Sequence, residues 1–251
     1  MALNWQEVTA IFGGAFDPPH LGHREAVESL LRNPGVKNVV VLPAGNPPLK
    51  TTGTPAEHRL AMTKLNFARL REGLSMRVEI DEREILRDTK KPSYTVDTIL
   101  EFRRDFDRPL AFVIGVDQIE SLERWHRIRE LLGLCHWIAI ERRSESGESD
   151  AANRMAHGLK RLQALGLLRS TANPREWRAH GGTVLLAVPT DARGTSSTEI
   201  RREFARGTPT APPISTQILG QIGSESLPEP TVENLHPDVE SYLKAHHLYG
   251  T

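Results

Sequence analysis

The sequence has one cysteine, no long apolar run and no net charge. A single thiol, Cys135, excludes an intramolecular disulfide and a metal centre held by several thiolates, and its apolar neighbours favour a small buried residue. No stretch approaches the roughly 20 apolar residues of a membrane-spanning helix. The 32 Lys and Arg are balanced by 32 Asp and Glu. This balance argues against bulk nucleic-acid binding as the main role, because that role needs a basic field.

With 251 residues, of which 38% are hydrophobic and 19 are Gly, the composition is that of a globular protein. This length predicts one large domain or a domain with sizeable insertions. The first residues lack the charged region and apolar core of an export signal. We therefore expect a cytoplasmic protein without membrane segments.

Short apolar runs alternate with helical periodicity over the first 142 residues. Such runs predict strands at residues 8–12, 39–42, 78–80, 110–114 and 136–140, and a later one at 183–188. Strands that are apolar throughout are typical of parallel sheets covered by helices on both faces. The alternation therefore predicts an α/β fold with a doubly wound, mainly parallel sheet and helices on both faces. Helices predicted at about 197–205 and 236–248 add a small C-terminal helical part.

Two segments interrupt this pattern. Residues 143–182 begin with a polar, charged loop and continue into a predicted helix. The apolar residues of that helix are Met155, Leu159, Leu162 and Leu165. Residues 207–235 contain several prolines and no Lys or Arg, which is typical of a long irregular connection. We expect a single domain over residues 1–251 with insertions at about 143–182 and 207–235. The first insertion could be a lid, a subunit contact or a lineage-specific addition.

The most informative motif is residues 13–23, GGAFDPPHLGH, directly after the first predicted strand. Its glycines allow the backbone to approach a ligand closely, and its prolines delay the helix that begins near His20. His20 and His23 are three residues apart, so they share one face of the first helical turn. The N-terminus of a helix attracts phosphate, and two imidazoles there can donate hydrogen bonds to phosphoryl oxygens. A surface accident or half of a metal site are the alternatives, but the position after the strand favours phosphate chemistry.

A second motif, residues 43–50 or PAGNPPLK, follows the second predicted strand. Its proline pairs stiffen the loop, and Lys50 places one mobile cation at the tip. An ordinary proline-rich turn with a solvated lysine is the alternative. In a parallel sheet this loop lies at the same edge as His20 and His23, which favours a phosphate contact.

A third motif, residues 194–202 or GTSSTEIRR, follows the late strand. Ser196 and Glu199 have the spacing of a capping box, which could by itself account for the run of hydroxyls. The same hydroxyls and the free N–H groups of a helix start can also hold a phosphate. Arg201 lies one turn further along, with a guanidinium suited to bidentate phosphate binding. Both interpretations can be true of one turn.

A fourth set of residues lies around the strand at 110–114. Residues 92–95, PSYT, precede a predicted helix, while Gly115 and Asp117 follow the strand and Trp125 comes later. Taken alone, Tyr94 and Trp125 are typical of core or surface aromatics. Asp117 could accept hydrogen bonds from ligand hydroxyls or cap a helix.

These motifs together resemble a known family. Residues 13–23 resemble the GGxFDPxHxGH signature of the nucleotidyltransferases that share the (H/T)xGH element, and most of all the bacterial nicotinate-nucleotide adenylyltransferases. Residues 43–50 are similar to the NxPPHK segment of that family, with Leu49 in place of its His. Residues 195–201 are similar to its ISSTxIR signature, with Thr195 in place of Ile. Ala15 replaces the usual Thr or Ser, which removes one hydroxyl that could contact phosphate.

The resemblance implies a Rossmann-like enzyme of NAD biosynthesis that transfers the adenylyl group of ATP to nicotinate mononucleotide, releasing pyrophosphate. The ATP site that it implies consists of Gly13, Gly14, Ala15, Phe16, His20, Gly22, His23, Gly115, Asp117, Ser197, Thr198 and Arg201. The pyridine-nucleotide site that it implies consists of Asn46, Lys50, Tyr94, Thr95 and Trp125.

Four of these residues are expected to act in catalysis. We expect His20 and His23 at the α- and β-phosphates, with His23 stabilising the transition state, and Lys50 and Arg201 at the departing pyrophosphate. The substrate phosphate is itself the nucleophile, so catalysis would depend on positioning and charge stabilisation. Mg²⁺ is expected to arrive with ATP, without metal ligands from the protein. Asp17 is expected to stabilise the turn rather than to bind a ligand.

Two other functions stay open at this point. The chain could be another small-molecule adenylyltransferase of the same superfamily, such as pantetheine-phosphate adenylyltransferase, or a non-catalytic module that senses nucleotides. The expected partners are ATP and nicotinate mononucleotide, with neither nucleic acid nor membrane. Sequence leaves open the choice between nicotinate and nicotinamide mononucleotide, as well as the oligomeric state.

Overall fold

A computed structural model describes residues 7–49, 52–73, 77–87, 91–143, 148–206 and 234–250. Lys50 and most of the proline-rich segment 207–235 lie outside these ranges. The roles expected of them therefore stay predictions.

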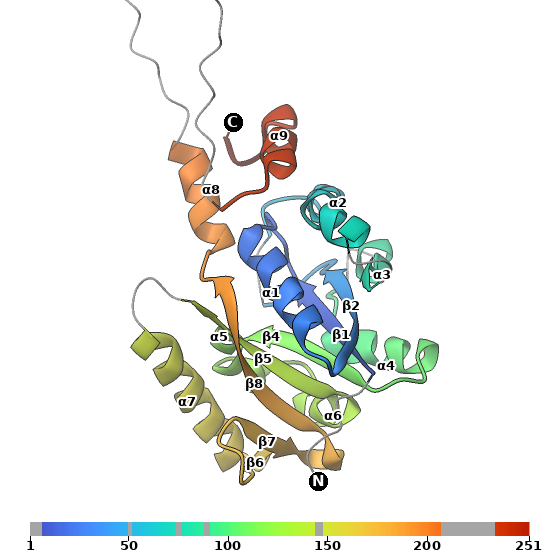
Figure 1. Ribbon diagram of the computed structural model, residues 1–251, viewed down its shortest axis with the longest axis vertical. Coiled ribbons are helices and arrows are strands. Elements are labelled where there is room, and N and C mark those ends of the chain that lie inside the picture. Colours follow the sequence, from blue (N-terminus) through green and yellow to red (C-terminus); the bar gives the residue numbers. More distant parts are fainter. Residues whose placement is uncertain are drawn as a thin grey trace, which may run out of the picture.

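Within the described ranges, eight strands form one sheet in the order β3-β2-β1-β4-β5-β8-β7-β6 (Figure 1). The strands are β1 (Val8–Gly14), β2 (Val36–Pro43), β3 (Val78–Ile80), β4 (Leu110–Gly115), β5 (His136–Arg143), β6 (Leu168–Ser170), β7 (Glu176–Ala179) and β8 (Val184–Arg193). The parallel part of the sheet consists of β3, β2, β1, β4, β5 and β8, whereas β7 and β6 add an antiparallel edge. The predicted doubly wound, mainly parallel sheet is confirmed.

Helices cover both faces of this sheet. The α-helices are α1 (Leu21–Arg32), α2 (Ala56–Gly73), α3 (Arg83–Leu86), α4 (Thr95–Asp105), α5 (Val116–Ile119), α6 (Ile128–Leu134), α7 (Glu148–Ala164), α8 (Ser197–Arg206) and α9 (Pro237–Ala245). Three 3-10 turns are described, namely η1 (Leu122–Arg124), η2 (His180–Gly182) and η3 (Leu248–Gly250).

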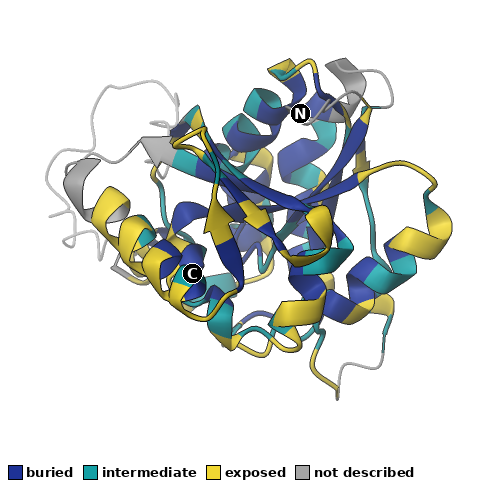
Figure 2. Ribbon diagram, turned by 90° about the horizontal axis from the view of Figure 1, so that it is seen from below, coloured by how far each residue is buried: buried dark blue, intermediate teal, exposed yellow. Residues whose placement is uncertain are grey.

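Alternate residues of each central strand enter different cores. Ala10 and Phe12 of β1 pack with the apolar residues of α1 and α2, whereas Ile11 packs with those of α4, α5, α6 and α7. Both faces are covered, so the central strands are buried along their length (Figure 2). This double burial is the physical reason for the uninterrupted apolar runs in the sequence.

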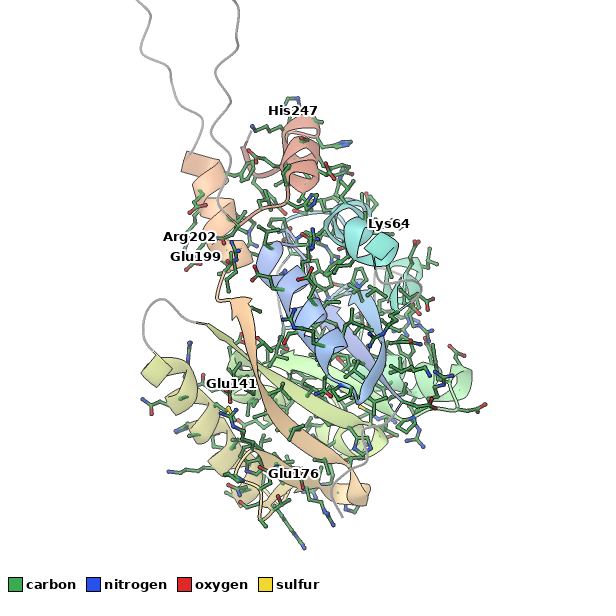
Figure 3. All side chains as sticks on the ribbon, in the orientation of Figure 1. Lys64, Glu141, Glu176, Glu199, Arg202 and His247 are labelled. Atoms are coloured by element: carbon green, nitrogen blue, oxygen red, sulfur yellow. The ribbon has the colours of Figure 1, made fainter. Side chains whose placement is uncertain are left out.

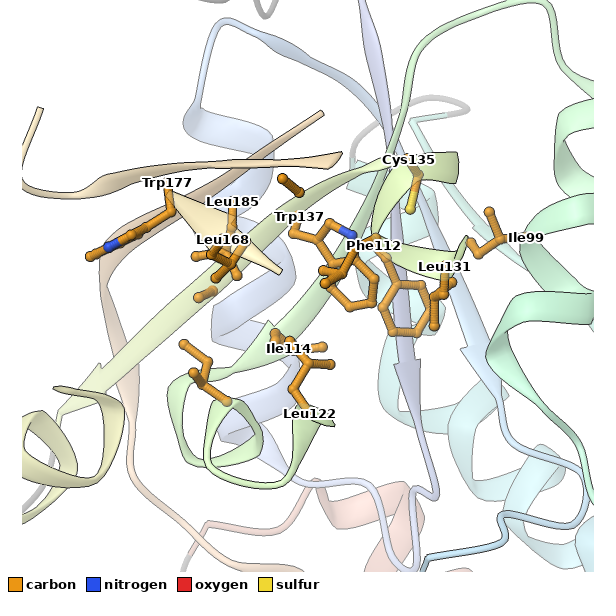
Figure 4. Close-up of a cluster of buried hydrophobic side chains, with 14 of the residues drawn as sticks. Ile99, Phe112, Ile114, Leu122, Leu131, Cys135, Trp137, Leu168, Trp177 and Leu185 are labelled. Carbon is orange, nitrogen blue, oxygen red and sulfur yellow. The ribbon is translucent and has the colours of Figure 1, made fainter. Parts of the chain in front are cut away.

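The larger core is built around aromatic rings. Phe112 of β4 and Trp137 of β5 lie side by side, with ring centroids 5.5 Å apart (Figure 4). Cys135 is buried in the same cluster, and this burial raises the pKa of its thiol to about 12. The prediction that Cys135 is a small buried residue is confirmed.

The C-terminal helices form a third, smaller core with α2. Its members are Met62 of α2, Ile200 and Phe204 of α8, Leu235, and Val239 and Leu243 of α9. Figure 1 shows α8 and α9 at the end of the molecule where β8 leads into α8, opposite α7 and β6. The predicted small helical part is confirmed, and α9 begins with Pro237 because His236 caps it, accepting the Asp238 N–H at 3.2 Å.

Segment 143–182 contributes to the sheet and to the larger core. Helix α7 was predicted, but strands β6 and β7 were not; they form a hairpin that extends the sheet beyond β8. Leu159 and Leu162 lie on α7 as predicted and are buried, whereas Leu165 follows the end of α7 and is 52% exposed. The expectation that Leu165 belongs to this helix was therefore wrong. None of the described helices is both long and apolar enough to cross a membrane.

Candidate active site

The order of the parallel strands reverses between β1 and β4, and the first motif lies at this point. In open α/β sheets, ligands bind in the crevice beyond the carboxyl ends of the strands on either side of such a reversal. The loop after β1 leads to His20, and β4 ends at Gly115, directly before α5. Gly14 pairs with Pro43 in the sheet, so the second motif begins beside the first.

The two histidines face one another across the start of α1. His20 is the N-cap residue, with extended backbone, and His23 is the third residue of the helix. Their rings are stacked with centroids 3.7 Å apart, and His23 Nδ1 accepts the His20 N–H at 3.2 Å. The predicted shared face is confirmed. Because Nδ1 of His23 accepts a hydrogen bond, the proton of its neutral ring is on Nε2, which is then a donor.

Aromatic packing holds the His23 ring in place. Phe16 lies edge-on to it, with centroids 5.0 Å apart, and Phe12 lies 6.1 Å away. Phe16 is buried although its φ of 49° is in the left-handed region, so tertiary packing fixes this turn. His20 is 1% exposed and His23 is partly exposed. Of the two imidazoles, His23 is therefore the more accessible to a ligand.

Three glycines of the first motif are explained by contacts inside the protein. A Cβ atom on Gly13 would lie 2.8 Å from the Phe112 ring, and one on Gly14 would lie 2.9 Å from the Phe16 ring. A Cβ atom on Gly22 would lie 2.6 Å from the Arg193 carbonyl oxygen, at the end of β8. Close packing thus requires glycine at these positions, independently of the ligand approach that the sequence suggested.

The second motif is hydrogen-bonded to the loop after β1 on one side and to residues 92–95 on the other. The Ala44 N–H donates to the Gly14 carbonyl at 2.8 Å, which links the loops after β2 and β1. Asn46 exchanges two hydrogen bonds with Ser93: its N–H donates to Ser93 Oγ at 3.1 Å, and its carbonyl accepts the Ser93 N–H at 2.8 Å. Asn46 therefore lies beside Tyr94 and Thr95, as a shared pyridine-nucleotide site would require.

The third motif packs against the first. Ser197 Oγ donates to the Pro18 carbonyl at 2.9 Å, and Arg201 Nη1 donates to the Asp17 carbonyl at 2.5 Å. Arg201 Nη2 also donates to Thr198 Oγ1 at 3.3 Å. Glu199 and Arg202 on the same helix are exposed (Figure 3). Phosphate binding by Ser197, Thr198 and Arg201 stays a prediction, but Ser197 and Arg201 also hold the loop before His20.

The start of α8 differs in one detail from the expected capping box. The Ser196 hydroxyl accepts the N–H of Thr198 at 3.2 Å, whereas a capping box would use the N–H of Glu199. Ser196 thus stabilises the start of the helix at its second residue.

Asp17 joins the first motif to two distant segments, and its expected role in stabilising its own turn stays a prediction. It is 4% exposed, and its carboxylate accepts the Gly53 N–H at 3.2 Å and the Tyr249 hydroxyl at 2.5 Å. The Tyr249 oxygen in turn accepts a hydrogen bond from Thr54 Oγ1 at 3.1 Å. Burial and the neighbouring Asp17 raise the pKa of Tyr249. No motif in the sequence indicates this contact, because it joins residues at opposite ends of the chain.

The remaining predicted residues lie on the β4 side of the crevice. Gly115 ends β4, and Asp117 is exposed near the start of α5. The Tyr94 ring stacks on His126 with centroids 4.1 Å apart. Trp125 is partly buried and lies edge-on to Phe112 and Trp137, each with centroids 6.0 Å apart. Stacking of Trp125 on a ligand ring stays a prediction.

Trp125 also borders a hollow of about 550 Å³. The other lining residues are Arg127, Ile128, Arg129, Glu130 and His180. These residues belong to the segment 125–130 and to η2, and neither His20 nor His23 lines the hollow. Within the described ranges, no group of three or more His, Cys, Asp or Glu side chains could hold a metal ion.

The fold and the histidine pair define a class of enzyme. The model of the cytidylyltransferase-like family matches residues 11–203, which include the end of β1, the histidine pair and most of α8. The chain is thus a nucleotidyltransferase of the cytidylyltransferase-like class.

Relatives of known name make the assignment more specific. The chain is 34% identical to the protein named "Probable nicotinate-nucleotide adenylyltransferase" of Sodalis glossinidius, over 90% of this chain and 99% of that protein. It is 33% identical to the protein of the same name from Pseudoalteromonas atlantica, over 91% of this chain and 98% of that protein. The chain belongs to the nicotinate-nucleotide adenylyltransferase family.

A solved structure has the same fold. Plasmodium falciparum nicotinic acid mononucleotide adenylyltransferase, complexed with NaAD, superposes with a TM-score of 0.59 at 17% identity. The superposition covers 97% of this chain and 98% of that chain.

Proposed function

We propose that this protein transfers the adenylyl group of ATP to the phosphate of nicotinate mononucleotide. The products are nicotinate adenine dinucleotide and pyrophosphate, in a step of NAD biosynthesis that we expect to take place in the cytoplasm. The observation that carries the proposal is the stacked His20–His23 pair at the point where the strand order reverses. The shared name of the relatives supports the choice of substrate.

The reaction needs no nucleophile from the protein. A phosphate oxygen of nicotinate mononucleotide attacks the α-phosphorus of ATP, and the bond from that phosphorus to the oxygen bridging to the β-phosphate breaks. Negative charge builds up on the α-phosphoryl oxygens and on the departing pyrophosphate. We assign His23 to the α-phosphoryl oxygens, because it is the more exposed of the two stacked imidazoles and lies at the start of α1.

Other residues bind and orient the two nucleotides. In this proposal, Ser197, Thr198 and Arg201 contact the ATP phosphates together with Lys50. Asn46 and Thr95 orient the pyridine nucleotide, which stacks on Trp125. Magnesium belongs to the substrate here, since it arrives on the phosphates of ATP and keeps most of its waters.

Release of pyrophosphate with three acceptors tests the proposed function. Purified protein is given Mg-ATP with nicotinate mononucleotide, nicotinamide mononucleotide or pantetheine phosphate, and pyrophosphate is measured by a coupled assay. We expect the highest kcat/KM with nicotinate mononucleotide. A higher value with pantetheine phosphate would establish the other adenylyltransferase instead, and ATP binding without pyrophosphate release from any acceptor would establish a nucleotide sensor.

A further inference from the structure

Two buried charged side chains lie between the predicted motifs, yet belong to none of them. Arg59 of α2 is 1% exposed, and Glu84 of α3 is 6% exposed. A buried charge is costly unless hydrogen bonds satisfy it. The contacts that satisfy these two charges involve the loops of the active site.

Arg59 joins the loops that follow β1 and β2. Its Nη1 donates to the Ala15 carbonyl at 2.9 Å and to the Ala44 carbonyl at 2.5 Å, and its Nη2 donates to the Gly45 carbonyl at 2.7 Å. Its Nε donates to the Thr54 carbonyl at 3.2 Å. One planar guanidinium therefore fixes the spacing between the first motif and the second.

Glu84 joins the loop after β2 to helix α4. One carboxylate oxygen accepts the Gly45 N–H at 3.4 Å, and the other accepts the Thr98 hydroxyl at 2.6 Å. Thr98 is fully buried and lies one turn after Tyr94 and Thr95. Both segments that Glu84 holds belong to the predicted pyridine-nucleotide site.

Gly45 is held by both charges. Arg59 binds its carbonyl, and Glu84 binds its N–H. A Cβ atom on Gly45 would overlap the Glu84 carbonyl oxygen, so glycine is required for this approach. Arg59 thus links Gly45 to Ala15 in the predicted ATP site, and Glu84 links Gly45 to helix α4 in the predicted pyridine-nucleotide site.

We propose that Arg59 and Glu84 are positioning residues for the transfer, Arg59 aligning the two nucleotide sites with each other and Glu84 shaping the acceptor site alone. This inference rests on the proposed function. In-line attack requires the acceptor oxygen and the α-phosphorus to lie within about 3–3.5 Å, and a displacement of about 1 Å costs roughly 100-fold in rate. A rigid link between the loops after β1 and β2 supplies that alignment.

Variants of the two residues should differ in a defined way. Glu84→Gln replaces one acceptor oxygen by a donor that opposes Gly45 or Thr98. We expect it to raise the Kd of nicotinate mononucleotide about tenfold, the effect of one mismatched buried hydrogen bond, while the Kd of a non-hydrolysable ATP analogue changes less than about twofold. Arg59→Lys cannot reach all four carbonyls. We expect it to raise both Kd values and to lower kcat by about 100-fold.

Thr98 provides a second test if a buried charge variant fails to fold. Thr98→Val removes the hydroxyl that Glu84 accepts, and Thr98→Ser retains it. Valine at this position should raise the Kd of nicotinate mononucleotide and leave that of the ATP analogue unchanged, whereas serine should restore wild-type binding. A purely structural role would change thermal stability in both variants without this selectivity.

Two control variants are matched to the two charges. Arg77 donates to the backbone carbonyls of Leu31, Val36 and Lys37, at the other end of β2, so Arg77→Lys should lower stability without changing either Kd. Glu141 of β5 pairs with Arg175 and is partly exposed, so Glu141→Gln controls for the loss of one carboxylate.

Titration calorimetry measures the Kd of each nucleotide without turnover and so tests the roles of Arg59 and Glu84. Pyrophosphate release by the wild-type protein tests the proposed function separately. The inference is wrong if Glu84→Gln and Thr98→Val change both Kd values equally or neither. It is also wrong if Arg77→Lys reproduces the changes caused by Arg59→Lys.

Discussion

The hydroxyl of Tyr249 donates a hydrogen bond of 2.5 Å to Asp17 Oδ1, so the turn after α9 is tied to the loop that leads to His20. The carbonyl of the same Asp17 accepts a hydrogen bond from Arg201 of α8. Two C-terminal elements therefore meet at one residue of the first motif. The loop that presents the histidine pair is held in part by residues more than 180 positions later in the chain.

Removing the Tyr249 hydroxyl should weaken both the fold and the site. Tyr249→Phe leaves one oxygen of the buried Asp17 carboxylate without this donor. We expect the free energy of unfolding to fall by about 1–3 kcal/mol and the KM for ATP to rise. Urea unfolding and steady-state kinetics measure the two effects.

Tyr242→Phe is the matched control for this variant. Tyr242 lies on α9, and its hydroxyl is 2.9 Å from His58 Nδ1, away from the Asp17 loop. Its loss should leave the KM for ATP unchanged. Equal effects of the two substitutions on this KM would rule out a specific role for the contact with Asp17.

His23→Ala should lower kcat by about 10²–10³-fold. Loss of one preorganised donor to a developing oxyanion has effects of this size in other enzymes. Turnover is measured with ATP and nicotinate mononucleotide at saturation, and His157→Ala, on the exposed face of α7, serves as the control. Near-normal turnover of the His23 variant would overturn the proposed mechanism.

Gly22→Ala should move α1 away from β8. The added Cβ atom would meet the Arg193 carbonyl oxygen at 2.6 Å, and a backbone atom cannot yield as a flexible side chain can. We expect a loss of stability of about 1–3 kcal/mol, typical of overpacking, and a lower kcat because His23 is the next residue. Gly53→Ala, where a Cβ atom has no neighbour within 4 Å, should be tolerated. Similar thermal shifts in both variants would contradict this account of Gly22.

Removal of divalent cations should stop turnover without unfolding the protein. In the proposed mechanism, magnesium arrives with ATP and the protein supplies no cage of carboxylates, so EDTA should leave the melting temperature unchanged. Excess MgCl₂ should restore activity fully. A large drop in melting temperature with EDTA would instead reveal a structural metal.

Much of the fold follows from the sequence, because the central strands are buried on both faces and read as unbroken apolar runs. Strands β6 and β7 are not buried in this way and were not predicted. They lie at the edge of the sheet and bury few side chains, among them Leu168, Trp177 and Ala179. Short strands with exposed charges such as Arg169 and Arg178 resemble loops in a periodicity analysis.

The candidate site was predictable only where a local motif carries the chemistry. His20, Asn46 and Arg201 each belong to a recognisable segment, and the parallel sheet explains why these segments meet. Arg59 and Glu84 are charged residues on helices, and their sequence context is that of ordinary surface residues. Their importance arises from contacts with residues up to 44 positions away, which only the folded chain reveals.

Stability should fall in mild acid, in part because of His136. Its Nδ1 accepts the Val184 N–H at 3.2 Å, where β5 and β8 begin, and burial lowers its pKa. The unfolded chain, in which this group has its ordinary pKa of 6.5, therefore binds the proton more tightly than the folded protein does. The stability that depends on neutral His136 is fully present above pH 6.5 and is lost as the pH falls below it. Urea unfolding of wild type and His136→Asn at pH 7.5, 6.5 and 5.5 should show a smaller loss in the variant, since Asn keeps an acceptor that does not titrate. His157→Asn is the exposed control, and equal pH dependence in all three proteins would exclude His136 as a source of the acid sensitivity.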